Sequence, residues 1–204
     1  PKVHKFIYFG IDNANNYEYV KKEFDLLYVG NNWFRWNDIF NLVNDIRPIR
    51  NKLTKVAIMG GYWGNEIMEG FETATYSEPN FLKENNIMIL PPAPYGEVEA
   101  SMSKGSINPI LIRPILNKLK LVTPRMLETF SANTVTVIPE YFTHSLELYG
   151  SEAEKLILKE RTNDLFLKIT DDYKFYSDIC ERIRAKLIRE HSYEIRLSEL
   201  MKFT

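Results

Sequence analysis

Short apolar runs that end in glycine or proline, each followed by a helical pattern, constrain the fold of this chain most strongly. Strands are expected over residues 24–30, 55–61 and 86–90, and the third run is stopped by the sequence PPAP. Apolar residues from Trp36 to Ile46 recur at helical spacing after the first run. Strands that alternate with helices are typical of a parallel sheet. We therefore expect an α/β fold.

The second half of the chain continues this alternation. We expect short helices over 97–104 and 142–149, a helix over 123–133, strands over 106–112, 134–138 and 155–158, and two closing helices from about 171 and over 192–203. Pro109 is expected to interrupt the strand at 106–112, and residues 5–12 to form a first strand or a linker strand. Together these elements predict a doubly wound parallel sheet that ends in helices.

Composition and charge exclude several classes of protein. The 204 residues are 45% hydrophobic and 26% charged, which is typical of a globular protein. The formal net charge is −1, so the chain lacks the excess of positive charge that binding to nucleic acid or an anionic membrane would need. No apolar run approaches the roughly 20 residues that span a bilayer. The lone Cys180 fits a reducing, cytoplasmic compartment, and the three scattered histidines predict no metal site. Since Pro1 replaces a starting Met, we expect a fragment of a longer protein.

The segment 121–140 carries the most specific chemistry. Thr123 is expected to cap a helix whose first residue is Pro124, and Arg125 and Glu128 then share one helix face. The helix N-terminus and the Arg125 cation suit a diphosphate, and Glu128 suits the hydroxyls of a ribose. The alternative is that Arg125 and Glu128 form a surface ion pair on an ordinary helix, and the residues alone do not decide between the two.

Glycines end two of the expected strands at the edge where doubly wound sheets bind ligands. Gly30, Gly60 and Gly61 would let the backbone approach a phosphate or a sugar closely, although glycine also ends strands without any binding role. Neither loop has a GxGxxG or Walker pattern, which disfavours an NAD site or a P-loop. Arg113 follows a strand at the same edge, so together with Arg125 it predicts an anion site.

Aromatic and amide residues surround the first glycine. Asn31 and Asn32 offer amide groups at the strand tip, although they also suit a simple turn. Trp36 lies on the apolar stripe of the next helix, so we expect it in the core. The role of Trp33 stays open, and Trp63 is expected either to line a cleft or to cover the edge of the sheet.

These motifs resemble those of a known family. The stretches YVGNNWFRW, VAIMGGYWG, LIRPILNKLKLVTPRMLETFSANTVTVIPE, LYGSEAEKLIL and EHSYEIRLSEL are similar to the carboxyl-terminal half of bacterial glycosyltransferases of the GT-B fold, in the family-1-like group related to spore-maturation proteins. The similarity covers about residues 24–203. It implies a Rossmann-like nucleotide-sugar-binding domain over 24–204, preceded by a linker strand and connection over 1–23.

The resemblance also implies where a nucleotide-diphosphate sugar binds. The acidic residue of the family's R-x-x-E-T element, which holds the ribose hydroxyls, falls on Glu128. The threonine and arginine near the diphosphate fall on Thr123 and Arg125. The loop over 92–95, which includes Tyr95, is where such folds usually hold the base.

Further positions follow from the same resemblance. The family's strand tip falls on Gly30, Asn31, Asn32 and Trp33. Its strand-end arginine and proline fall on Arg113 and Pro114. The chain departs from the family in having Asn133 where glycine is common.

The resemblance implies a metal-independent glycosyltransferase that needs no cofactor beyond its donor sugar. Arg113 and Arg125 are expected to act in catalysis by stabilising the charge of the leaving diphosphate. The expected partner is the amino-terminal GT-B domain, which holds the acceptor and is missing from this chain, so the fragment alone is expected to be inactive. The alternative is a Rossmann-like scaffold or interaction module without catalytic activity.

Overall fold

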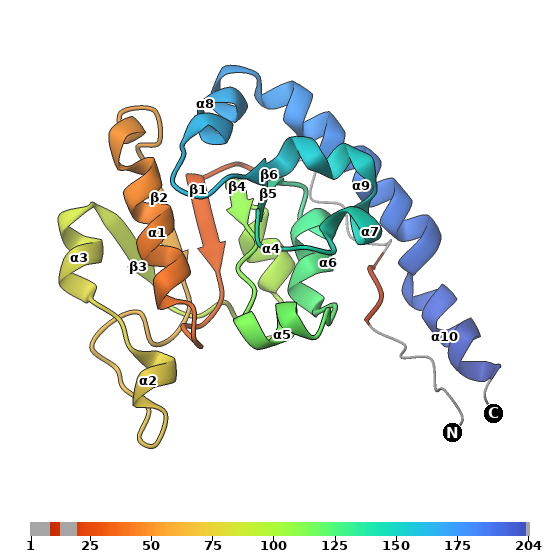
Figure 1. The fold of residues 1–204 in the computed structure, drawn as a ribbon, viewed down its shortest axis with the longest axis horizontal. Coiled ribbons are helices and arrows are strands. Elements are labelled where there is room, and N and C mark those ends of the chain that lie inside the picture. The colour runs from red at the N-terminus through yellow and green to blue at the C-terminus, as the bar shows by residue number, and fades with distance from the viewer. Residues whose placement is uncertain (1–8, 13–19, 203–204) are drawn as a thin grey trace.

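The computed structural model describes residues 9–12 and 20–202 of the chain. Within them, six strands form a parallel sheet in the order β3-β2-β1-β4-β5-β6. The strands are β1 (Phe24–Val29), β2 (Val56–Met59), β3 (Ile87–Leu90), β4 (Gly105–Pro109), β5 (Val135–Pro139) and β6 (Ile157–Leu158). The expected α/β fold with a doubly wound, Rossmann-like parallel sheet is confirmed (Figure 1).

Helices connect the strands and close the chain. They are α1 (Trp36–Ile46), α2 (Glu72–Thr75), α3 (Pro79–Glu84), α4 (Val98–Met102), α5 (Pro114–Lys118), α6 (Pro124–Ser131), α7 (Ser145–Tyr149), α8 (Asp164–Asp171), α9 (Tyr173–His191) and α10 (Tyr193–Met201), with 3-10 turns η1 (Arg47–Ile49) and η2 (Ser151–Leu156). The sequence analysis missed α2, α3, α5 and α8. Pro109 ends β4 instead of interrupting it, because proline cannot donate to the next rung of the sheet.

Alternate residues of β1 pack on opposite faces of the sheet. Leu26 and Tyr28 belong to the cluster that includes the apolar stripe of α1, whereas Leu27 and Val29 pack with Met102 of α4. All four of these β1 residues are buried, as a central strand covered on both faces requires. The helices α1 and α4 therefore cover opposite faces.

The two closing helices run along one side of the molecule (Figure 1). The residues Tyr176, Ile179, Cys180, Ile183 and Leu187 form the buried stripe of α9, as expected. Asp172 caps α9 by accepting a hydrogen bond from Phe175 N, and Ser192 caps α10 in the same way from Ile195 N. None of the helices within the described ranges is long and apolar enough to cross a membrane.

Residues 5–8 of the expected linker strand over 5–12 lie outside the described residues. All of residues 13–19, in the expected connection, lie outside them as well. Within 9–12, Ile11 is buried and forms an isolated parallel bridge with Ser192. Its N–H donates to the His191 carbonyl oxygen at 2.9 Å. The segment before the sheet therefore packs at the junction of α9 and α10.

The strand order places a switch point between β1 and β4. From β1 the chain continues to β2 on one side of the sheet, and from β4 it continues to β5 on the other side. The loops after these two strands therefore diverge at the carboxyl edge and leave a crevice between them, which is where doubly wound sheets bind ligands. This edge positions the candidate site.

Candidate functional site at the carboxyl edge of the sheet

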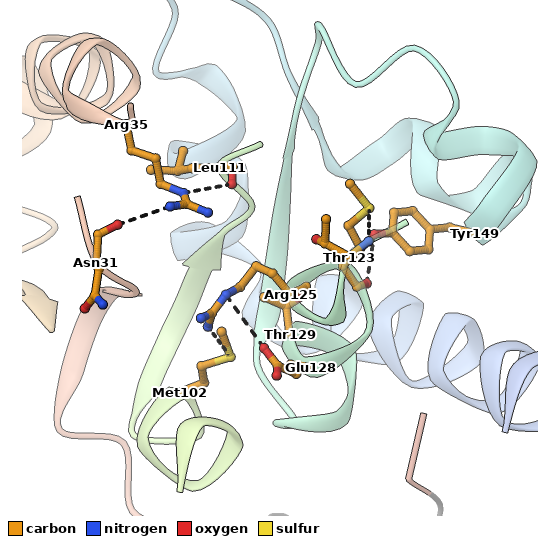
Figure 2. Close-up of polar contacts among 10 residues, drawn as sticks. Asn31, Arg35, Met102, Leu111, Thr123, Arg125, Glu128, Thr129 and Tyr149 are labelled. Atoms are coloured by element: carbon orange, nitrogen blue, oxygen red, sulfur yellow. Dashed lines mark hydrogen bonds and ion pairs between the residues drawn. The ribbon is translucent and has the colours of Figure 1, made fainter. Parts of the chain in front are cut away.

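Arg35 connects the two loops that diverge at the switch point. Its Nε donates to the Leu111 carbonyl oxygen at 3.4 Å, and its Nη1 donates to the Asn31 carbonyl oxygen at 3.2 Å (Figure 2). Asn31 follows β1 and Leu111 follows β4, so this guanidinium lies across the crevice. The sequence analysis did not select Arg35. The signal that could have found it is its place a few residues after Gly30, directly before α1.

Arg113 brings a second cation to the crevice from the loop after β4. Its guanidinium carbon lies 5.6 Å from the centroid of the Trp33 ring, so the two predicted residues are in contact. Burial lowers the pKa of Arg113, and the nearby charge of Arg35 lowers it further. Arg113 Nε has no hydrogen-bond partner among the described residues. An anion would relieve the repulsion between the two cations and satisfy the unpaired donor.

Arg125 brings a third cation, from the first turn of α6. Its Nη1 lies 3.6 Å from Met102 Sδ, and its Nε lies 3.7 Å from Glu128 Oε2 (Figure 2). The Arg125 and Glu128 side chains are 19% and 26% exposed, so the pair is largely buried. The ion pair that the sequence left open is therefore present, but it lies inside the protein surface instead of on it.

The start of α6 has the expected geometry. Thr123 is the N-cap residue with an extended backbone, and Pro124 is the first helical residue. Thr123 N–H donates to Met126 Sδ at 3.4 Å, and the Met126 carbonyl oxygen accepts from Tyr149 Oη at 2.8 Å (Figure 2). Contacts with the core therefore fix the position of this helix N-terminus.

Backbone packing explains the glycines at the strand tips. A Cβ on Gly60 would lie 2.2 Å from the Gly30 carbonyl oxygen, so the loops after β1 and β2 meet backbone to backbone. Trp63 Nε1 donates to the same oxygen at 2.7 Å. Trp63 is fully buried, so it supports this contact and does not line a cleft. Gly61 N–H donates to Asn31 Oδ1 at 2.8 Å, which leaves these two residues at the surface of the loop pair.

Asn32 orders the neighbouring loop. Its side chain is fully buried, and Nδ2 donates to the carbonyl oxygens of Tyr62, Thr75 and Tyr76. A ligand could recruit this amide only by breaking those bonds. Trp36 is buried in the core, as expected.

Tyr95 lies in the loop after β3, and its side chain is fully exposed. The same loop borders the second glycine tip, because the Pro92 ring lies 3.9 Å from the position of a Cβ on Gly61. Tyr95 is thus at the same edge of the sheet as the three arginines, but on the side of β2 and β3.

A small cavity lies beside the crevice, between α1 and the ends of β4, β5 and β6. It has a volume of about 150 Å³, and Asp38 and Tyr141 line it. Tyr141 Oη donates to Asp38 Oδ2 at 3.1 Å and accepts from Ile112 N at 3.4 Å. Burial raises the pKa of Asp38 to about 6, although the hydrogen bond from Tyr141 opposes the shift. Sequence patterns did not indicate this pair, because its members are far apart in the chain.

Within residues 9–12 and 20–202, no three His, Cys, Asp or Glu side chains are grouped so that they could hold a metal ion. This edge presents the guanidinium groups of Arg35, Arg113 and Arg125, backbone N–H groups and the Glu128 carboxylate. Such a set binds anions with attached hydroxyl groups.

Comparison with known proteins identifies the fold. No protein-family model and no curated sequence matches the chain. Its structure is similar to that of a mutant of T4 phage BGT in complex with UDP-glucose, with a TM-score of 0.60 at 15% identity over 83% of this chain. It is also similar to a trehalose-phosphate synthase from Burkholderia xenovorans in complex with glucose-6-phosphate (TM-score 0.56, 12% identity, 87% of this chain).

A third similar structure is the pneumococcal O-GlcNAc transferase GtfA in complex with UDP and GlcNAc, with a TM-score of 0.57 at 11% identity over 95% of this chain. The chain spans 44%, 42% and 38% of the lengths of these three structures, respectively. At such low identity the comparisons establish a shared fold. That fold is a Rossmann-like α/β fold with a parallel sheet.

Proposed function

We propose that the chain binds a nucleotide-diphosphate sugar as the donor-binding part of a glycosyltransferase. The observation that carries this proposal is the gathering of Arg35, Arg113 and Arg125 from three separate segments at the switch point. Several cations from different directions suit a diphosphate, which offers many oxygens to planar guanidinium groups. Two similar structures hold UDP or UDP-glucose, which supports a donor of this class.

Each predicted residue has a role in this proposal. The diphosphate binds at Arg113 and at the start of α6, where Thr123 and Arg125 lie. Glu128 accepts hydrogen bonds from the ribose hydroxyls, and its ion pair with Arg125 holds it in place. The base rests against the loop that contains Tyr95, since an exposed aromatic ring can stack on it.

The tips of β1 and β2 form the floor of the proposed site. Asn31, Trp33 and Gly61 border the ligand directly, while Gly30, Asn32 and Gly60 hold the two loops together. The sequence analysis treated all six residues as ligand-binding, whereas in this proposal three of them contact the ligand and three support the loops.

The proposed reaction breaks the bond between the anomeric carbon and the diphosphate oxygen. The electron pair of that bond leaves with the nucleoside diphosphate, while an acceptor hydroxyl bonds to the anomeric carbon and passes its proton to a base of the acceptor-binding domain. Arg113 and Arg125 stabilise the negative charge that develops on the leaving diphosphate. Preorganised cations perform this role without a metal ion or a further cofactor.

We further propose that the chain is one half of a bacterial, cytoplasmic GT-B enzyme of the family-1-like group. The span of less than half of each similar structure supports this view. An amino-terminal domain would bind the acceptor and complete the cleft, so the isolated chain is expected to bind donor without transferring sugar.

Titration with UDP, GDP, ADP and TDP tests the proposed function. Calorimetry and tryptophan fluorescence are both suitable, because Trp33 lies against Arg113 and its emission should respond to the ligand. We expect saturable binding of at least one nucleotide. Arg113→Ala should weaken that binding roughly ten- to a hundredfold, which corresponds to one charge-assisted hydrogen bond.

Arg182→Ala is the matched control for this experiment. Arg182 lies on α9 and forms an ion pair with Glu152 at 2.9 Å, and it makes no contact with the residues of the proposed site among the contacts described. Its removal should leave nucleotide affinity unchanged. If a folded sample responds to none of the four nucleotides, the donor-binding proposal fails and a scaffold without nucleotide affinity becomes the better account.

A further inference from the structure

The hydroxyl of Tyr28 is a buried polar group without a partner. Tyr28 is in β1, its side chain is 1% exposed, and its Oη has no hydrogen-bond partner among the described residues. Buried hydroxyl groups in folded proteins are nearly always hydrogen-bonded, because leaving one unpaired costs free energy. This exception therefore calls for a specific explanation.

A second tyrosine shows that the fold can satisfy such a group. Tyr149 is equally buried at 1% exposure, and its hydroxyl donates to the Met126 carbonyl oxygen at 2.8 Å. Tyr173 likewise donates to the Ser106 carbonyl oxygen at 3.4 Å. The unpaired hydroxyl of Tyr28 is thus a local feature of the carboxyl edge and not a general property of buried tyrosines in this protein.

The loop above Tyr28 is built around its hydroxyl. A Cβ on Gly30 would lie 2.7 Å from Oη, so any larger residue at this position would displace the hydroxyl. On the other side the Tyr28 ring packs edge-on against Trp63, with 5.9 Å between centroids. The ring is therefore held in place, and the hydroxyl is kept at the tip of β1.

The charges of three arginines reach this hydroxyl. The charges of Arg35, Arg125 and Arg113 each act to lower the pKa of Tyr28, but burial, together with the charge of Asp38, outweighs them and the pKa is raised overall. The hydroxyl therefore stays protonated and can donate a hydrogen bond at neutral pH. Arg113 Nε, a second unpaired and buried donor, belongs to the same group of residues. Two unpaired donors among three cations define a site for an oxyanion.

We propose that the Tyr28 hydroxyl donates a hydrogen bond to the bound anion and is the deepest donor of the diphosphate site. This inference rests on the proposed function and adds a residue to it. A neutral acceptor would satisfy the hydroxyl but would leave the repulsion between Arg35 and Arg113 in place. Since the hydroxyl is covered, contact with an anion requires the groups that cover it to move.

Tyr28→Phe tests the inference, because it removes the hydroxyl and keeps the ring. Calorimetric titrations with UDP and with inorganic pyrophosphate should both show an affinity roughly ten- to a hundredfold lower than that of the wild type. In the absence of ligand, the variant should unfold at the same temperature as the wild type or a higher one, because it loses an unpaired polar group.

Two tyrosine variants serve as controls. Tyr149→Phe should unfold at a lower temperature, because its hydroxyl has a partner in the protein. Tyr173→Phe should leave the affinity for UDP unchanged, because Tyr173 packs against the start of β4, at the opposite edge of the sheet.

Two results would overturn the inference while leaving the proposed function intact. One is wild-type binding of UDP that Tyr28→Phe retains in full. The other is a Tyr28→Phe variant that loses stability as Tyr149→Phe does, or fails to fold, since the hydroxyl would then serve the fold. A wild-type protein that binds neither UDP nor pyrophosphate would overturn both proposals.

Discussion

At the scale of single residues, burial and charge decide how each group at the carboxyl edge behaves. Arg113 and Arg35 are close enough for their charges to interact, and Arg113 is also partly desolvated, so its charged form is less favoured than in water. Charged groups that are destabilised in this way are common where a protein binds a charged ligand, because the opposite charge of the ligand offsets the repulsion between them. The arginine cluster therefore fits a binding role better than a structural one.

Asp38 gives a prediction for the dependence of stability on pH. Burial raises its pKa from 3.8 to about 6, so the folded protein holds this proton more tightly than the unfolded chain. Its stabilising contribution is therefore present below about pH 4 and is lost as the pH rises through 6. Relative to Asp38→Asn, the wild type should lose roughly 2 kcal/mol in its free energy of unfolding between pH 4 and 7.

Urea unfolding of both proteins across this range checks the prediction. Asparagine keeps an oxygen that can accept from Tyr141, so the comparison isolates the ionisation of Asp38. A difference between the two proteins that stays constant with pH would show that Asp38 has an ordinary pKa.

Gly60 gives a prediction about the packing of the loops. In Gly60→Ala the new Cβ would meet the Gly30 carbonyl carbon and oxygen at 2.5 and 2.2 Å, and the backbone would have to shift. We expect the free energy of unfolding to fall by about 1–3 kcal/mol or more. Gly64→Ala is the control, because nothing lies within 4 Å of its added Cβ. Equal stability of the two variants in thermal unfolding would refute the proposed contact.

At the scale of elements, α6 connects the proposed diphosphate site to the core. Its first residues follow from local rules, since Thr123 is a good cap and Pro124 a good first residue. Its buried face, which includes Met126, Leu127 and Phe130, packs into the main core. The helix therefore presents Arg125 and Glu128 from a fixed base, which lowers the cost of ordering them around a ligand.

Glu128→Ala separates binding of the ribose from binding of the diphosphate. Affinity for UDP should fall by roughly tenfold, because the hydrogen bonds to the ribose are lost. Affinity for inorganic pyrophosphate should stay the same or rise, because the carboxylate 3.7 Å from Arg125 is removed. Parallel calorimetric titrations measure both. Equal losses for the two ligands would mean that Glu128 positions Arg125 and does not contact ribose.

Local patterns predicted some elements well and others not at all. The strands β1 and β2 were found because apolar runs end in glycine, and α1 because its apolar residues recur at helical spacing. The short helices α2 and α5 were missed because four or five residues are too few to establish a period. Asn133, which departs from the family's glycine, adopts a φ of 51°, a left-handed conformation that asparagine tolerates.

The candidate site was predicted only in part, because its decisive contacts are long-range. The segment 121–140 indicated the start of α6 and the pair Arg125 and Glu128. The position of Arg35 across two loops and the unpaired hydroxyl of Tyr28 depend on the order of β1 and β4 in the sheet. Likewise, the sequence did not show that Asn32 is used inside the fold.

At the scale of the whole molecule, strand order turns separate segments into one site. The loops after β1 and β4 are more than 70 residues apart in sequence, and they meet because these strands are neighbours at the switch point. The net charge of the chain is −1, so the positive charge at this edge is a local feature. A local cationic crevice on a nearly neutral protein suits a small anionic ligand.

Mapping of backbone amide chemical shifts during titration with UDP tests the central claim most directly. We predict that the largest shifts occur at residues 30–35, 111–113 and 123–128, which surround the three arginines. Shifts that gather instead around the cavity lined by Asp38 and Tyr141, or no shifts at saturating UDP, would contradict a diphosphate site at the switch point between β1 and β4.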